Sequence, residues 1–67
     1  MDKLINKMVA EYKADHITWH DIQDIVEARI MQQDGQGMTT DRDIIADRFY
    51  KTGVILAQIE NQLKGGE

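Results

Sequence analysis

The sequence predicts an all-α protein with a short N-terminal helix and an antiparallel α-hairpin, three helices in all, completed by dimerisation. Apolar residues recur every three to four positions along three segments. The 67 residues contain no proline, which fits uninterrupted helices. Two Thr-x-x-Asp patterns resemble helix capping boxes, and the Gly-rich residues 34–37 separate the two helices that these patterns would start.

The chain is short for a fold that stands alone, and residues 1–67 form a single small domain at most. A chain of this size buries only about 60% of the surface that its unfolded form exposes. Domains below roughly 70–80 residues often depend on disulfides, a metal or oligomerisation. Because the sequence has no cysteine, disulfides and thiolate metal sites are excluded, and self-association is the expected supplement.

The first helix is predicted at about residues 2–15. Asp2 stands where a carboxylate stabilises a helix N-terminus. The apolar residues follow the spacing of an amphipathic helix, and they are Leu4, Ile5, Met8, Val9 and Tyr12.

The second helix is predicted at about residues 18–33. Thr18 and Asp21 form the expected capping box, and Ile17 and Ile22 occupy the two hydrophobic staple positions. Gly35 suits the left-handed position after the helix. Trp19 is interpreted as a packing anchor between the first two helices. The expected apolar face consists of Trp19, Ile22, Ile25, Val26, Ile30 and Met31.

The third helix is predicted at about residues 40–64, with Thr39 or Thr40 as its N-cap and 65–67 as a frayed tail. Gly53 either breaks this helix or lies inside it. We expect a continuous helix in which Gly53 permits a close helix crossing, because no proline or polar cluster accompanies the glycine. A heptad spacing predicts one packing face, made by Ile45, Phe49, Thr52, Leu56, Ile59 and Leu63.

The charge of the chain is unevenly distributed. The net charge is −4, but residues 11–47 hold nine acidic and three basic side chains, a net of −6. An acidic centre disfavours direct nucleic-acid binding and suits either a solvated surface or a basic protein partner. The sequence shows no signal peptide and no membrane span, so a soluble cytoplasmic protein is expected.

Catalytic chemistry has little support. The chain has no serine and no cysteine, and no lysine, threonine or tyrosine has a base at an informative spacing. We therefore predict no enzyme activity, no catalytic residues and no cofactor. A metal site is an alternative for His16, His20, Asp24 and Glu27 if they share one helix. Thr18 as N-cap separates the two histidines, so no metal is predicted.

The predicted function is binding. The second helix is too short to cover the third. The first helix can fold back to cover more, but Ile55, Ile59 and Leu63 in the apolar C-terminal half are still expected to lack a partner within the monomer. This favours a small protein–protein interaction factor, such as an adaptor, assembly protein or inhibitor of the kind encoded by phages and mobile elements. A homodimer through the third helix is the simplest partner. The predicted partner-binding residues are Phe49, Leu56, Ile59, Leu63, Asp43 and Asp47.

The alternative is a nucleic-acid-linked regulator. Residues 44–63 resemble a helix-turn-helix with its turn at 49–51, although residues 52–63 hold no lysine or arginine to contact DNA. An acidic DNA mimic that captures a DNA-binding protein is the other form of this hypothesis. Its ladder of carboxylates would consist of Asp21, Asp24, Glu27, Asp41, Asp43 and Asp47.

Overall fold

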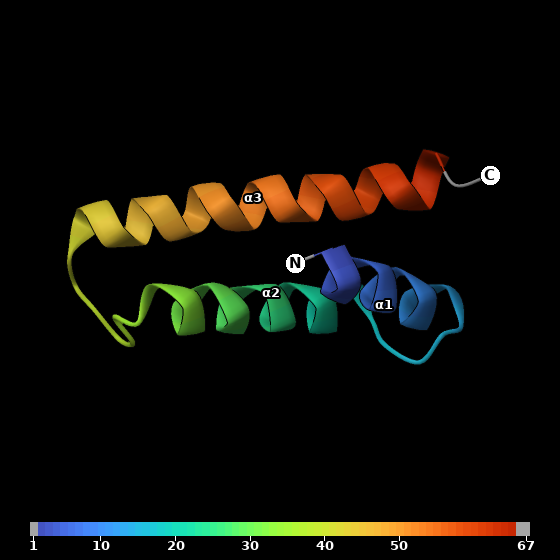
Figure 1. Ribbon diagram of the computed structural model, residues 1–67, viewed down its shortest axis with the longest axis horizontal. Coiled ribbons are helices and arrows are strands. Elements are labelled where there is room, and N and C mark those ends of the chain that lie inside the picture. The colour runs from blue at the N-terminus through green and yellow to red at the C-terminus, as the bar shows by residue number, and fades with distance from the viewer. Residues whose placement is uncertain (1, 66–67) are drawn as a thin grey trace.

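The computed structural model describes residues 2–65, which form three helices and no strand. The helices are α1 (Asp2–Lys13), α2 (Trp19–Asp34) and α3 (Arg42–Gly65), as Figure 1 shows. The predicted all-α class and the three helices are confirmed. Gly65 ends α3 and is not part of a tail, whereas residues 66–67 of the predicted tail lie outside the described residues.

The first helix ends two residues earlier than predicted, because Asp15 leaves the helical conformation. Its φ of 62° is left-handed, and it is the single described non-glycine residue with a positive φ. The His16 amide donates to the Glu11 carbonyl (2.9 Å) and the Asp15 amide to the Tyr12 carbonyl (3.1 Å). These two bonds form a Schellman motif, which usually places glycine where Asp15 stands. This helix end was not predicted, since aspartate is a weaker signal for a left-handed residue than glycine.

The local signals at both ends of α2 are confirmed. The Asp21 amide donates to Thr18 Oγ1 (3.2 Å), and the Thr18 amide donates to Asp21 Oδ2 (2.9 Å), which completes the capping box. Ile17 packs against the core and Ile22 is fully buried, as expected of staple residues. Gly35 has a φ of 68°, and its amide donates to the Met31 carbonyl (3.2 Å).

The start of α3 corrects the prediction of Thr39 or Thr40 as N-cap. Asp41 Oδ1 accepts from the amides of Asp43 (2.9 Å) and Ile44 (3.5 Å), and the Asp41 carbonyl accepts the first helical bond, from Ile45. Thr39 Oγ1 accepts from the Asp41 amide instead. The helix therefore begins at Arg42 and not at residue 40, because aspartate is a stronger N-cap than threonine.

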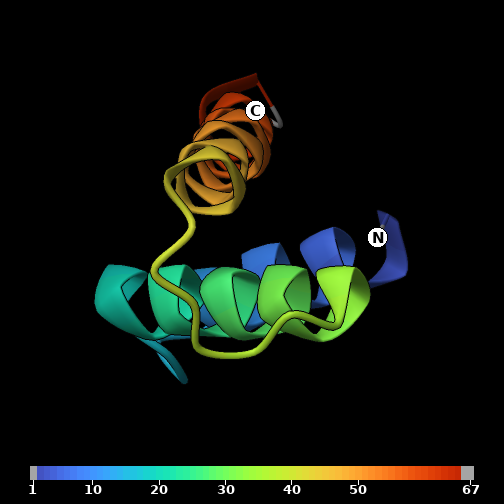
Figure 2. The same cartoon turned by 90° about the vertical axis from the view of Figure 1, so that its left-hand side faces the viewer.

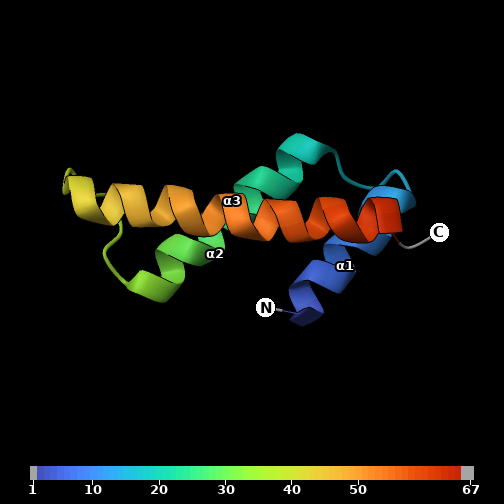
Figure 3. The same ribbon diagram turned by 90° about the horizontal axis from the view of Figure 1, so that it is seen from above.

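The three helices form two layers. In Figures 1 and 2, α3 lies on one side and α1 and α2 lie together on the other. Figure 1 shows α1 beneath the C-terminal half of α3 and α2 beneath its N-terminal half. Seen from above in Figure 3, α3 crosses α2 obliquely. The antiparallel hairpin and the dimer stay predictions. The molecule is elongated, with extents of 40 × 20 × 19 Å.

All three helices contribute to one core. Its buried members are Ile5, Met8, Val9, Ile22, Val26, Ile30 and Ile59. Ile55, Leu56 and Leu63 are half-buried and pack against this cluster. The prediction that the C-terminal half of the third helix lacks cover is therefore wrong. The short first helix folds back under this half, which hydrophobic spacing along the chain did not reveal.

Gly53 does not interrupt α3, which runs through it without a break. The predicted continuity is confirmed, but the proposed reason is not. A Cβ atom added at Gly53 would meet nothing within 4 Å, so neither of the other two described helices approaches closely there. An exposed glycine inside a helix costs about 1 kcal/mol relative to alanine. Packing within the chain therefore gives no reason for a glycine at this position.

Candidate protein-binding groove

Apolar side chains are left uncovered in the N-terminal half of α3, the opposite half to the one predicted. Phe49 and Tyr50 each expose 72% of their surface. Beside Phe49 lies a cavity of about 300 Å³ between α2 and α3, called the groove below. It is lined by Glu27, Ile30, Met31, Ile45, Arg48, Phe49 and Thr52.

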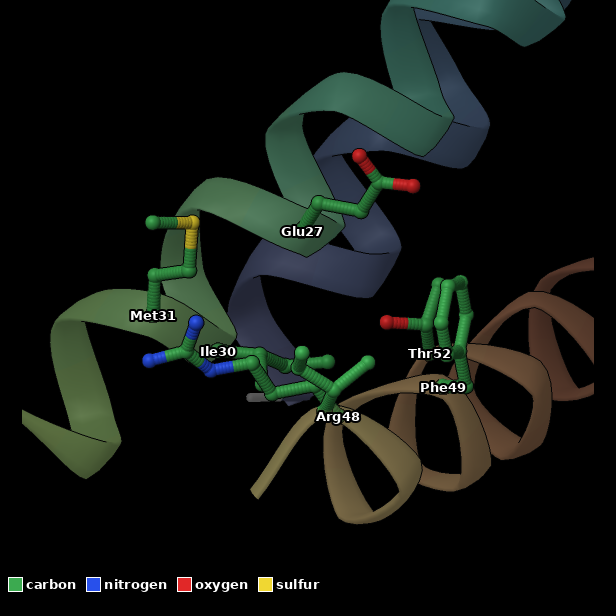
Figure 4. A pocket seen from close by; sticks show the side chains of 7 residues that line it. Glu27, Ile30, Met31, Arg48, Phe49 and Thr52 are labelled. Atoms are coloured by element: carbon green, nitrogen blue, oxygen red, sulfur yellow. The ribbon is translucent and has the colours of Figure 1, made fainter. Parts of the chain in front are cut away.

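The two walls of the groove come from α2 and α3, and each combines polar and apolar side chains. Figure 4 shows Glu27 and Met31 projecting from α2 on one side, with Phe49 and Thr52 projecting from α3 on the other. Ile30 and Ile45 add apolar surface, so the groove suits an aliphatic or aromatic side chain. Met31 is an adaptable wall, because methionine repacks easily around different shapes. Glu27 provides a carboxylate beside the apolar surface.

An ion pair joins the two helices at the groove. Arg48 Nε contacts Asp34 Oδ2 at 2.6 Å, and Arg48 Nη2 donates to Asp34 Oδ1 at 2.9 Å. Both side chains are largely covered. The hydrogen bond from Arg48, helped by the Gln36 amide, lowers the pKa of Asp34 from 3.8 to about 2. A bidentate pair fixes both partners, so Arg48 holds the last turn of α2 against α3.

This pair predicts an acid-sensitive contribution to stability. The pKa of Asp34 is lower in the folded chain than in the unfolded one, so the unfolded state takes up a proton first as the pH falls. The contribution should be complete above about pH 4 and lost as the pH falls towards about 2. Urea unfolding of Arg48→Gln at pH 5, 3 and 2 should lose less stability over this range than the parent chain. Equal losses would contradict the assignment.

The six residues predicted to bind a partner do not form one surface. Ile59 is fully buried in the core, which corrects its assignment to an uncovered face. Leu56 and Leu63 are half-buried and pack against the core, so little of either side chain is free for a partner. Phe49 alone among the four apolar members is mostly exposed, and it lines the groove.

The two predicted carboxylates lie elsewhere on α3. At about 100° per residue, Asp47 precedes Phe49 by roughly 200°, which places it on nearly the opposite side of the helix. Asp47 Oδ2 contacts Lys51 Nζ at 2.8 Å, a pair with spacing i, i+4. Asp43 is exposed in the first turn of α3. Neither carboxylate lines the groove.

Several acids of the proposed DNA-mimicking ladder have roles inside the fold. Asp21 caps α2, and the backbone and hydroxyl bonds from Thr18 lower its pKa. Asp41 caps α3, and Asp47 pairs with Lys51. Asp24 Oδ2 lies 3.2 Å from His20 Nδ1. These contacts within the chain account for four of the six ladder residues without a DNA-binding protein as partner.

The histidines contact separate carboxylates. His16 Nδ1 lies 2.7 Å from Glu11 Oε2, whereas His20 contacts Asp24. Within residues 2–65, no three or more histidine, cysteine or acidic side chains gather closely enough to hold a metal ion.

The helix-turn-helix alternative loses its structural basis. That motif requires a turn near residues 49–51, but α3 is helical throughout this stretch.

Trp19 packs as expected, with its ring edge-on to Tyr12 of α1 at a centroid distance of 6.2 Å. It therefore anchors α2 to α1.

Comparisons add no assignment. Searches of protein-family models, curated proteins and solved structures find no match to this chain.

No helix in the part of the chain that the structure describes combines the length and apolarity needed to cross a membrane.

Sequence reasoning missed the residues that complete the groove. Glu27 and Met31 approach Phe49 only because α2 and α3 cross at this point. No spacing within one helix encodes that meeting. Tyr50 is 72% exposed and lies about 100° beyond Phe49 around α3, so it does not line the groove.

Proposed function

We propose that this chain is a small protein–protein interaction factor, which acts by binding rather than by catalysis. The observation that carries the proposal is Phe49, an aromatic side chain that is 72% exposed at the wall of an apolar groove. Large aromatic side chains beside pockets are the usual centres of protein interfaces. An adaptor, assembly protein or inhibitor would use such a surface.

The residues that line the groove indicate which side chains a partner would present to it. An apolar side chain of the partner enters between Met31 and Phe49, and a lysine or arginine beside it reaches Glu27. The acidic central region of the chain attracts the same basic segment over a longer range. Direct nucleic-acid binding is not part of the proposal, since phosphates would meet a net charge of −6 over residues 11–47.

Capture experiments with matched variants test the groove. The immobilised chain is compared with Phe49→Asp and Met38→Asp in a lysate of the organism that encodes it. Met38 is 92% exposed in the connection between α2 and α3 and does not line the groove, so its variant controls for losing an exposed apolar residue. A partner of the groove should be retained by the parent chain and Met38→Asp, and bind at least about 30-fold more weakly to Phe49→Asp.

Salt and folding controls complete this test. An apolar contact should resist added salt, whereas capture through the acidic surface should weaken steeply. Because Phe49 is exposed, Phe49→Asp should change the free energy of unfolding by no more than about 0.5 kcal/mol. Capture that is equal for all three proteins, or abolished by salt alone, would contradict the groove as the binding surface.

The proposal keeps self-association through the third helix, together with the antiparallel arrangement of the second and third helices. Because the C-terminal half of the third helix is covered, the support for self-association is the large accessible surface of the molecule as a whole. The accessible surface is 4979 Å², against about 4,300 Å² for a compact monomer of this mass. The difference approaches the roughly 800 Å² that each partner buries in a standard interface.

A further inference from the structure

One face of α3 has no neighbour among residues 2–65. Figure 2 shows α1 and α2 on the same side of α3, so the opposite side of the helix is uncovered. Along this side in the middle of α3 runs a strip of residues that are exposed, uncharged and mostly apolar, with the Asp47–Lys51 ion pair beside it. The residues of this strip are Ala46, Tyr50, Gly53, Val54 and Ala57, called the outer face below.

The spacing of the outer face is that of a helix–helix interface. Ala46, Tyr50, Gly53 and Ala57 follow a 4-3-4 pattern, and all five residues fall within an arc of about 100°. Tyr50 and Val54 are among the most exposed large apolar side chains of the described residues. Gly53 lies midway along the length of the outer face, at one edge of its arc, with open space where a Cβ would stand. A second helix can therefore approach the backbone most closely at this point.

We propose that a second copy of this chain docks on the outer face, with the two α3 helices antiparallel and related by a two-fold axis near Gly53 and Val54. This inference rests on the proposed self-association and names its surface. The axis places Gly53 and Val54 of one copy beside the same residues of its partner. Tyr50 of each copy then lies over Ala57 of the other.

Charge favours the antiparallel orientation. Asp43 lies in the first turn of α3 and Lys64 in the last, and both are exposed. An axis near residues 53 and 54 brings Asp43 of one copy opposite Lys64 of the other. Antiparallel alignment also opposes the two helix dipoles. A parallel pair would instead place Asp43 beside its own copy, and like charges in that position repel.

The outer face and the groove are separate surfaces. Phe49, Met31 and Glu27 line the groove, and none of them belongs to the outer face. A dimer of this geometry leaves both grooves available to other partners. A variant that loses dimerisation can therefore still be tested for binding of a partner in the groove, and the reverse also holds.

Sedimentation equilibrium of the parent chain and of variants tests the dimer. The parent chain should approach twice the chain mass over a roughly hundredfold range of concentration. Gly53→Arg adds a bulky, charged, helix-favouring side chain where the monomer has open space, so it should fold but dimerise at least about 30-fold more weakly. Gln32→Arg makes the same charge change at an exposed position of α2 and should dimerise like the parent.

Disulfide trapping tests the orientation, because the chain has no cysteine of its own. The antiparallel arrangement places Val54→Cys next to its copy, whereas the two copies of Asp43→Cys stand about 30 Å apart along the helix. Oxidation should therefore cross-link Val54→Cys alone.

Three outcomes would overturn the inference. They are a parent chain that stays monomeric at every concentration, a Gly53→Arg dimer as tight as that of Gln32→Arg, and cross-linking of Asp43→Cys as efficient as that of Val54→Cys. None of these results bears on the groove, which Phe49→Asp tests separately.

Discussion

Replacing Ile59 with alanine is expected to lower the free energy of unfolding by about 2–5 kcal/mol. Ile59 is 0% exposed and is the one fully buried residue that α3 gives to the core. Truncation leaves a cavity between helices that cannot easily close around it. Because a small domain has a total stability of only about 5–15 kcal/mol or less, the variant should be partly unfolded at room temperature. Urea titration followed by circular dichroism at a fixed protein concentration measures the loss.

Ile25→Ala is the matched control for this prediction. It makes the same chemical change on α2 at a residue that is 36% exposed, so the loss should be smaller, below about 1.5 kcal/mol. The comparison of the two variants also tests whether the C-terminal half of α3 packs against α1 and α2. If Ile59→Ala were no more costly than Ile25→Ala, the C-terminal half of α3 would not be packed against α1 and α2.

Asp15→Gly is expected to raise the free energy of unfolding by about 1 kcal/mol, the second-largest change. Asp15 adopts a φ of 62° at the end of α1, and a left-handed backbone costs an L-residue about 1–2 kcal/mol. Glycine adopts this conformation without that strain, although its freedom in the unfolded chain offsets part of the gain. The thermal midpoint should rise by roughly 4–8 °C.

Two further variants at residue 15 separate backbone strain from charge. Asp15→Asn removes the negative charge near the C-terminus of α1 while keeping a residue that tolerates a positive φ, so it reports the electrostatic part alone. Asp15→Ala removes the charge but retains the full left-handed strain. If Asp15→Ala raised the midpoint as much as Asp15→Gly, relief of strain would not explain the effect.

The parts of the fold that the sequence predicted well are those encoded by neighbouring residues. The Thr18–Asp21 capping box needs only four consecutive positions, and the left-handed Gly35 needs only one turn of helix. The continuity of α3 through Gly53 followed from the absence of other helix-breaking residues. Two predicted helix boundaries were wrong. Asp41 is the N-cap of α3 in place of Thr39 or Thr40, and Asp15 ends α1 without a glycine.

The candidate site was predicted only in part. Phe49 was selected for its apolar position on a long helix, and it does line the groove. Ile59 was selected on the same argument and is buried. The periodicity of α3 treats both residues alike, because a heptad spacing states which residues share a face. It does not state which part of that face another helix of the same chain will cover.

The sequence by itself determined the three helices, the caps of α2 and the acidic character of this protein, because each depends on contacts within a few residues or on composition alone. Only the tertiary structure decided which surfaces remain free. The first helix, α1, folds back and covers Ile59 in the C-terminal half of α3, whereas α2 crosses α3 obliquely and leaves Phe49 beside an open groove. These outcomes depend on the angles at which the helices pack, which are set by the shapes of many side chains together.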